Sequence, residues 1–172
     1  MFSVQSATRL INRTRALTES WEAKTNPATS PYHNPLSQIS VFVLLDLLGS
    51  ANPIVQSQYL ETHWAYKNMA SIEDRLRKLG LLESRSPSAF FDTNVEITPP
   101  SDNITAINDH VPFLSRGVPV IPIFPSTVPA VYGTMDDNGK NLDLPTVRDW
   151  TRIVTAFALE WLDMMEVWPD EV

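Results

Sequence analysis

The segment ISVFVLLDLL, residues 39–48, decides the fold of this chain. It is rich in valine, isoleucine and leucine, and both of its alternating sets of positions are largely apolar. A strand without a polar side is typical of a parallel sheet whose two faces are both covered. The segment ends between Gly49 and Pro53. Asp46 is the one charged residue in it, so the pattern predicts a buried strand that carries a single carboxylate.

Residues 118–124 (VPVIPIF) predict a second buried strand. Its two prolines have no N–H to donate to a ladder, so we expect at least one flank of this strand to be an edge or a bulge. Helical patterns surround the two strands. Residues 1–24 predict a modest helix, and the polar, proline-containing residues 84–109 predict a long excursion over the surface.

Residues 60–79 predict an amphipathic helix that Gly80 ends. Its apolar stripe consists of Trp64, Met69, Ile72, Leu76 and Leu79. We expect the pairs Glu73–Arg77 and Asp74–Lys78 on its outer face, because residues four apart are neighbours on a helix.

A last helix is predicted to open at residues 143–145, where an aspartate cap precedes an early proline. Its apolar stripe consists of Val147, Trp150, Val154, Phe157, Trp161 and Met165. We expect both tryptophans, Trp150 and Trp161, to lie in the core. Strands that alternate with helices predict an α/β fold with a mainly parallel sheet and covering helices. Two strands are few for three helices, so strands are missing or hidden, and an exposed sheet edge predicts self-association.

Composition excludes several classes of function. The 172 residues hold 13 basic and 20 acidic side chains, a net charge of −7, which argues against nucleic acid as a partner. There is no cysteine, so disulfides and thiolate metal sites are excluded. The longest apolar run, residues 41–45, is far below the roughly 20 residues of a membrane span. The start of the sequence carries no signal-peptide pattern, which leaves the location unknown.

Four segments occur in the order of a known family: FVLLDLLGSANP (42–53), LRKLGLL (76–82), NDHVPFLSRGVPV (108–120) and YGTMDDNGKNLD (132–143). Together they resemble the C-terminal half of the glutaminyl-peptide cyclotransferases, a branch of the zinc aminopeptidase-like fold. The resemblance implies a partial aminopeptidase-like fold with missing strands. It assigns residues 25–172 to the C-terminal part of a cyclotransferase-like domain, and leaves 1–24 as a helical segment whose start does not match the family.

The resemblance also implies an activity. Such enzymes convert the N-terminal glutamine of peptides to pyroglutamate and release ammonia, and they usually occur in the secretory pathway. A single zinc polarises the side-chain carbonyl, and an adjacent glutamate moves the proton. The expected partners are therefore peptides with an N-terminal glutamine.

The residues at the family's site positions depart from the pattern. One acidic position of the family is still acidic here, as Asp46. Another acidic position is occupied by Asn108, which carries an amide instead. The zinc-binding histidine corresponds to Gly133, and a second site histidine falls at Pro122. Two positions on the substrate side hold Tyr132 for a tryptophan and Val128 for a phenylalanine. The family's upstream Asp and Glu ligands have no counterpart here.

No zinc-ligand set remains in the sequence. The three histidines, His33, His63 and His110, lack the short spacing of metal ligands, and Asp136 with Asp137 is more typical of a turn than of a calcium loop. We therefore expect a truncated, catalytically inactive relative that binds no zinc. The alternatives are a zinc aminopeptidase-type peptide hydrolase, a non-catalytic interaction module, and a truncated or misjoined product.

Overall fold

The computed structural model describes residues 4–93, 97 and 108–164. Along the chain lie α1 (Val4–Ala23), β1 (Phe42–Leu45), α2 (His63–Lys78), α4 (Val111–Leu114), β2 (Val120–Ile123) and α5 (Leu144–Trp161). Short 3-10 turns occupy Leu36–Gln38, Leu60–Thr62 and Gly139–Asn141. No helix among these residues is long and apolar enough to cross a membrane.

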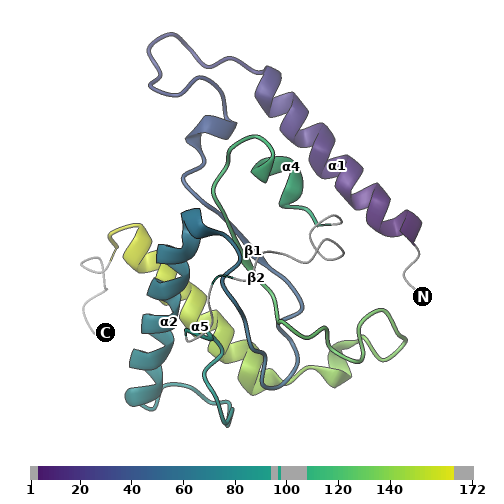
Figure 1. Ribbon diagram of the computed structural model, residues 1–172, viewed down its shortest axis with the longest axis vertical. Coiled ribbons are helices and arrows are strands. Elements are labelled where there is room, and N and C mark those ends of the chain that lie inside the picture. The colour runs from purple at the N-terminus through teal and green to yellow at the C-terminus, as the bar shows by residue number, and fades with distance from the viewer. Residues whose placement is uncertain (1–3, 94–96, 98–107, 165–172) are drawn as a thin grey trace, which may run out of the picture.

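The two strands form the centre of the molecule. They are parallel, with Phe42 opposite Val120 and Leu45 opposite Ile123. Helices α2 and α5 lie together on one side of the strands, and α1 and α4 lie on the other (Figure 1). This arrangement confirms the predicted α/β class, in which helices cover both faces of a parallel sheet.

Each side of the sheet has its own core. The larger one joins the strands to α2 and α5 through buried residues that include Met69, Ile72, Ile121, Ile123, Trp150 and Phe157. The smaller one consists of Leu36, Phe113 and Val118, with Trp21 of α1 and Phe42 of β1 against it. Phe42 therefore packs against the smaller core and its neighbour Val43 against the larger one, because successive side chains of a strand point to opposite faces.

Strand β1 is shorter than predicted. Of residues 39–48 only Phe42–Leu45 is regular strand, and Leu47, with a φ of 58°, turns the chain out of it. The expectation that the segment is buried on both faces is wrong at Leu45, because 47% of this side chain is exposed. Strand β2 is buried at all four positions, as predicted.

Helix α2 ends at Lys78, and Gly80, with a φ of 69°, lies just after its cap, which confirms the predicted stop. Two expectations about its faces are wrong. Trp64 and Leu79 are exposed, although they belong to the apolar stripe. Glu73 is 1% exposed rather than on the outer face, because its carboxylate binds backbone amides of the following segment.

Helix α5 begins as predicted, with the Asp143 carboxylate accepting a hydrogen bond from the Thr146 amide at 3.1 Å. Trp150 is buried, but the prediction that Trp161 is a core residue is wrong. Its ring stacks on that of Trp64 at a centroid distance of 5.1 Å, and both rings remain partly exposed at the end of the helix pair. Met165 lies outside the described residues.

The predicted surface excursion at 84–109 is wrong at Phe90 and Phe91. Phe90 and Phe91 are buried in the larger core, where both rings contact Trp150. The backbone there pairs with Val55, whose amide bonds the Phe90 carbonyl at 2.7 Å. Residues 94–96 and 98–107 of that segment lie outside the described residues.

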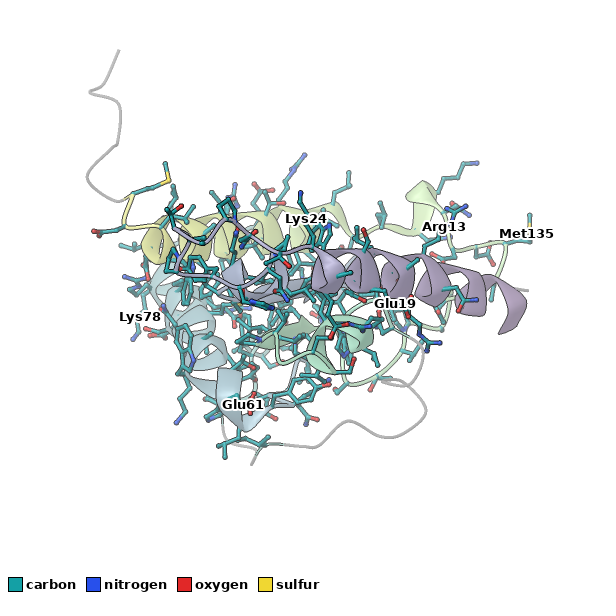
Figure 2. The ribbon with its side chains drawn as sticks, turned by 90° about the horizontal axis from the view of Figure 1, so that it is seen from above. Arg13, Glu19, Lys24, Glu61, Lys78 and Met135 are labelled. Atoms are coloured by element: carbon teal, nitrogen blue, oxygen red, sulfur yellow. The ribbon has the colours of Figure 1, made fainter. Side chains whose placement is uncertain are left out.

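Helix α1 is bound to the rest of the chain along one side. Thr14 donates a hydrogen bond to the Asp109 carboxylate at 2.7 Å, and Glu22 pairs with Arg116 at 2.7 Å. Arg13 and Glu19 are exposed on the rest of its surface, and Lys24 is exposed just after its end (Figure 2). The helix therefore covers the segment that includes Asn108 and Asp109.

Candidate functional site

A cavity of about 370 Å³ opens where β1 ends. Its walls are the residues directly after the strand and the loop between β2 and α5. The lining residues are Asp46, Leu47, Leu48, Gly49, Ser50, Pro129, Val131, Tyr132, Asp137, Asn138, Asn141 and Leu142. The carboxyl ends of parallel strands are the usual place for ligands in α/β folds, so this cavity is the candidate site.

Asp46 stands at the end of β1, where its amide bonds the Ile123 carbonyl at 3.1 Å. Its carboxylate forms hydrogen bonds with the Leu47 amide and the Asn108 side chain. Because the Asn108 Oδ1 already accepts from the Asp109 amide at 2.9 Å, the NH₂ group is the part of Asn108 that faces Asp46. The structure therefore brings together two of the residues that the sequence singled out.

The environment of Asp46 changes its acidity. Burial raises the pKa of this carboxyl, the hydrogen bonds from Leu47 and Asn108 lower it, and the charge of Asp109 raises it again, with a net rise. An amide donates a hydrogen bond but does not take up a proton. Asp46 and Asn108 thus form an acceptor and a permanent donor, and not a pair of acids that share a proton.

The positions expected on the substrate side differ in their placement. Tyr132 lines the cavity and remains half exposed. Val128 is exposed and is not among the lining residues. Gly133 has a φ of 71°, and a Cβ built on it would have no neighbour within 4 Å. The backbone conformation, rather than lack of space, is what favours glycine there.

The loop supplies residues that the sequence did not single out as site residues. Asp137 was interpreted as a turn former, and it does accept a hydrogen bond from the Gly133 amide at 3.3 Å. It also lines the cavity, together with Asn138 and Asn141. Met135 projects from the loop tip into solvent (Figure 2). Turn residues bring polar groups to a site only when the loop folds back on the sheet, which local composition does not reveal.

The donors around the cavity do not fit a zinc ion. Gly133 has no side chain to offer, and the described residues contain no group of three or more histidine, aspartate or glutamate side chains that could hold a metal. The histidines are used separately: His63 bonds Ser57 at 2.8 Å, and His110 bonds the Tyr59 hydroxyl at 3.3 Å.

His110 makes stability depend on pH. It is fully buried, and burial lowers its pKa, although the charge of Asp109 opposes this. The unfolded state then binds the proton more readily, so the contribution of neutral His110 is complete above its ordinary pKa of 6.5 and is lost as the pH falls below it. We expect the unfolding free energy to decrease from pH 7 toward pH 5 in denaturant titrations. The decrease should be smaller in His110→Asn, and an unchanged slope would contradict the assignment.

Two parallel strands with helices on both faces, and a cavity where one strand ends, define an α/β protein with its candidate site at the carboxyl edge of the sheet. The chain belongs to peptidase family M28, which matches residues 23–158. This confirms the resemblance drawn from the four motifs.

Individual relatives are glutaminyl cyclases. The chain is 36% identical over 151 residues to the glutaminyl-peptide cyclotransferase of Boiga dendrophila, covering 87% of this chain and 39% of that protein. It is 38% identical over 135 residues to the glutaminyl-peptide cyclotransferase-like protein of Mus musculus, covering 78% and 34%. The crystal structure of Macrostomum lignano glutaminyl cyclase superimposes with a TM-score of 0.74 at 30% identity, over 87% of this chain and 47% of that one. The chain thus spans less than half the length of each of these relatives.

Proposed function

We propose that this chain is a non-catalytic member of the glutaminyl-peptide cyclotransferase group that binds the amino-terminal end of peptides. The observation that carries the proposal is the location of the Asp46 carboxylate at a cavity without basic side chains. Its carboxylate stands at the cavity, held by the amide of Asn108, and the cavity lining contains no lysine, arginine or histidine to neutralise it.

The same residues argue against cyclisation. The reaction that the resemblance implies needs an electrophile on the glutamine carbonyl and a group that carries the proton from the α-amine to ammonia. By the resemblance, Gly133 takes the position of the metal-binding histidine, and glycine has no side chain to offer as a ligand. Asn108 stands at the position of an acid and cannot titrate. The groups that would perform the chemical step are therefore missing from the matched positions.

Binding of a peptide ammonium group needs fewer groups than cyclisation does, namely a carboxylate and a wall for the first side chain. Asp46 and Asp137 give the cavity two carboxylates, and Tyr132 gives it an aromatic wall. A peptide α-ammonium can donate to a carboxylate, with the first side chain along the tyrosine ring. The cavity is large enough for the first residue of a peptide, since small-molecule sites begin at about 300 Å³.

The test joins an activity assay to a binding assay on the purified 172-residue chain. With added zinc and a peptide that begins with glutamine, we expect no pyroglutamate above the uncatalysed rate, whereas the Macrostomum lignano enzyme should form it. Calorimetry should still detect binding of the peptide, and N-acetylation of its amino end should abolish the signal.

Asp46→Asn should weaken peptide binding roughly 10- to 100-fold, which corresponds to about 1.5–3 kcal/mol for a charge-assisted hydrogen bond. Asp74→Asn is the matched control, because Asp74 is exposed on α2 and should leave binding unchanged. Zinc-dependent pyroglutamate formation would overturn the non-catalytic assignment. Release of free glutamine would instead support the hydrolase alternative, and equal binding of the acetylated peptide would contradict the ammonium site.

A further inference from the structure

A second cavity lies directly beside the candidate site. It measures about 390 Å³ and follows the loop that precedes α5. Four residues line both cavities, namely Ser50, Val131, Asn141 and Leu142. The other residues that line the second cavity are Ala51, Ala130, Lys140 and Asp143. A peptide whose first residue occupies the candidate site therefore has its following groups within reach of the second cavity.

The two cavities differ in charge. The candidate site is lined by two carboxylates, Asp46 and Asp137, and by no basic side chain. The second cavity is lined by Lys140, which is exposed and forms no ion pair within the part of the chain that the structure describes. The acid that also lines it, Asp143, accepts from the Thr146 amide at 3.1 Å and lies at the positive end of the α5 dipole. Lys140 is therefore the cation that a ligand meets in this cavity.

Hydrogen bonds hold the backbone of Lys140 next to the candidate site. The residue belongs to the short turn Gly139–Asn141, and its amide donates to the Oδ1 atom of Asn138 at 3.0 Å. Three positions on, the Asp143 amide donates to the Gly49 carbonyl at 2.9 Å, which joins this loop to the segment after β1. The cation of one cavity and the carboxylate that follows β1 in the other are thus carried by two segments that bond each other.

From this pair of opposite charges we infer that the peptide recognised by this chain carries a carboxylate close behind its amino end. The inference rests on the proposed function, because the α-ammonium group of the peptide must first bind at Asp46. Lys140 then binds the carboxylate, which is either the side chain of an acidic second residue or the C-terminus of a dipeptide. Opposite charges in the two cavities complement those of the ligand and fix the direction in which it lies. Lys140 is thus a specificity-determining residue of the site.

Calorimetry of the full chain with two pairs of ligands tests the inference and separates the two sources of the carboxylate. The first pair is Gln-Glu-Ala and Gln-Gln-Ala, both with an amidated C-terminus, and the second is Gln-Ala with a free and with an amidated C-terminus. In at least one pair, the ligand with the carboxylate should bind roughly two- to fivefold more tightly, as an exposed ion pair allows. The pair that shows the difference identifies the source. The difference should shrink as the salt concentration rises, because ions screen exposed charges.

Variants assign the preference to Lys140. Lys140→Met should remove the difference within the pair, and Lys140→Glu should reverse it, so that Gln-Lys-Ala binds more tightly than Gln-Glu-Ala. Lys67→Met is the matched control, because Lys67 is an exposed lysine on α2 that lines neither cavity. Its variant should keep the full preference for the carboxylate.

The outcomes separate this inference from the proposed function. Equal binding within both pairs, with N-acetylation still abolishing the signal, would overturn the role of Lys140 and leave the ammonium site at Asp46 in place. A preference that Lys140→Met leaves intact would also overturn it, because the carboxylate would then bind another cation. If none of the four ligands bound, the proposed function and this inference would both be wrong.

Discussion

Replacement of Glu73 by alanine should lower the free energy of unfolding by about 3–5 kcal/mol, because it removes one partner of a buried, hydrogen-bonded ion pair. The carboxylate accepts from the Phe90 and Phe91 amides at 2.7 and 3.1 Å and from the Arg77 guanidinium at 2.6 Å. Alanine would leave the Phe90 and Phe91 amides without an acceptor inside the larger core. Equilibrium denaturation with urea measures the loss, which is a large share of the 5–15 kcal/mol typical of a domain.

Asp74 provides the control on the neighbouring position of α2. It also pairs with a basic residue four positions on, Lys78 at 2.6 Å, but both side chains are mostly exposed. Asp74→Ala should cost less than about 0.5 kcal/mol, as exposed pairs on helices do. Equal losses for Glu73→Ala and Asp74→Ala would show that burial of the carboxylate does not decide its contribution.

Asp149→Ala should destabilise the chain by about 3 kcal/mol, since two backbone donors would be left unsatisfied. Asp149 is fully buried in α5, and its two oxygens accept from the Glu83 and Ser84 amides at 2.7 and 2.8 Å. These bonds fix the chain just after α2 against α5. Asp149→Asn keeps one acceptor oxygen and should lose about half as much.

Arg148→Ala is the matched control for Asp149, one position earlier on the same helix. Arg148 pairs with Glu83 at the surface, so its removal should have a much smaller effect on the midpoint of thermal unfolding. If Arg148→Ala lowered the midpoint as much as Asp149→Ala, the ion pairs of Glu83 would hold the two helices together instead of the buried carboxylate.

The predictable part of the fold is the part that local pattern controls. The apolar runs predicted both strands. The aspartate cap at Asp143 predicted the start of α5, and Gly80 predicted the end of α2. Burial of single side chains was harder to predict. Glu73 has a surface pattern, but amides that follow it in the chain by 17 and 18 positions draw it inside. Phe90 and Phe91 lie in a polar, proline-containing stretch, and only tertiary contact with Trp150 buries them.

The candidate site could be predicted in part. The position of Asp46 within an apolar strand and the match of Asn108 and Tyr132 to the family motifs named three residues that the structure places at or beside one cavity. Asp137 was missed, because an aspartate in a turn has a sufficient local reason to be there. Its second role depends on how the loop lies over the end of β1, which is a property of the whole fold.

The edge of β2 that faces away from β1 limits the addition of further strands to the sheet. A fibril grows by strand pairing only if every added sheet has two unpaired edges. One edge binds the sheet already present, and the other binds the next sheet. At the edge of β2 that faces away from β1, Pro122 has no N–H to donate. The Val120 carbonyl already accepts a hydrogen bond from the Thr62 hydroxyl. The sheet therefore cannot template a further strand beyond β2, and growth of a fibril by strand addition is blocked on that side.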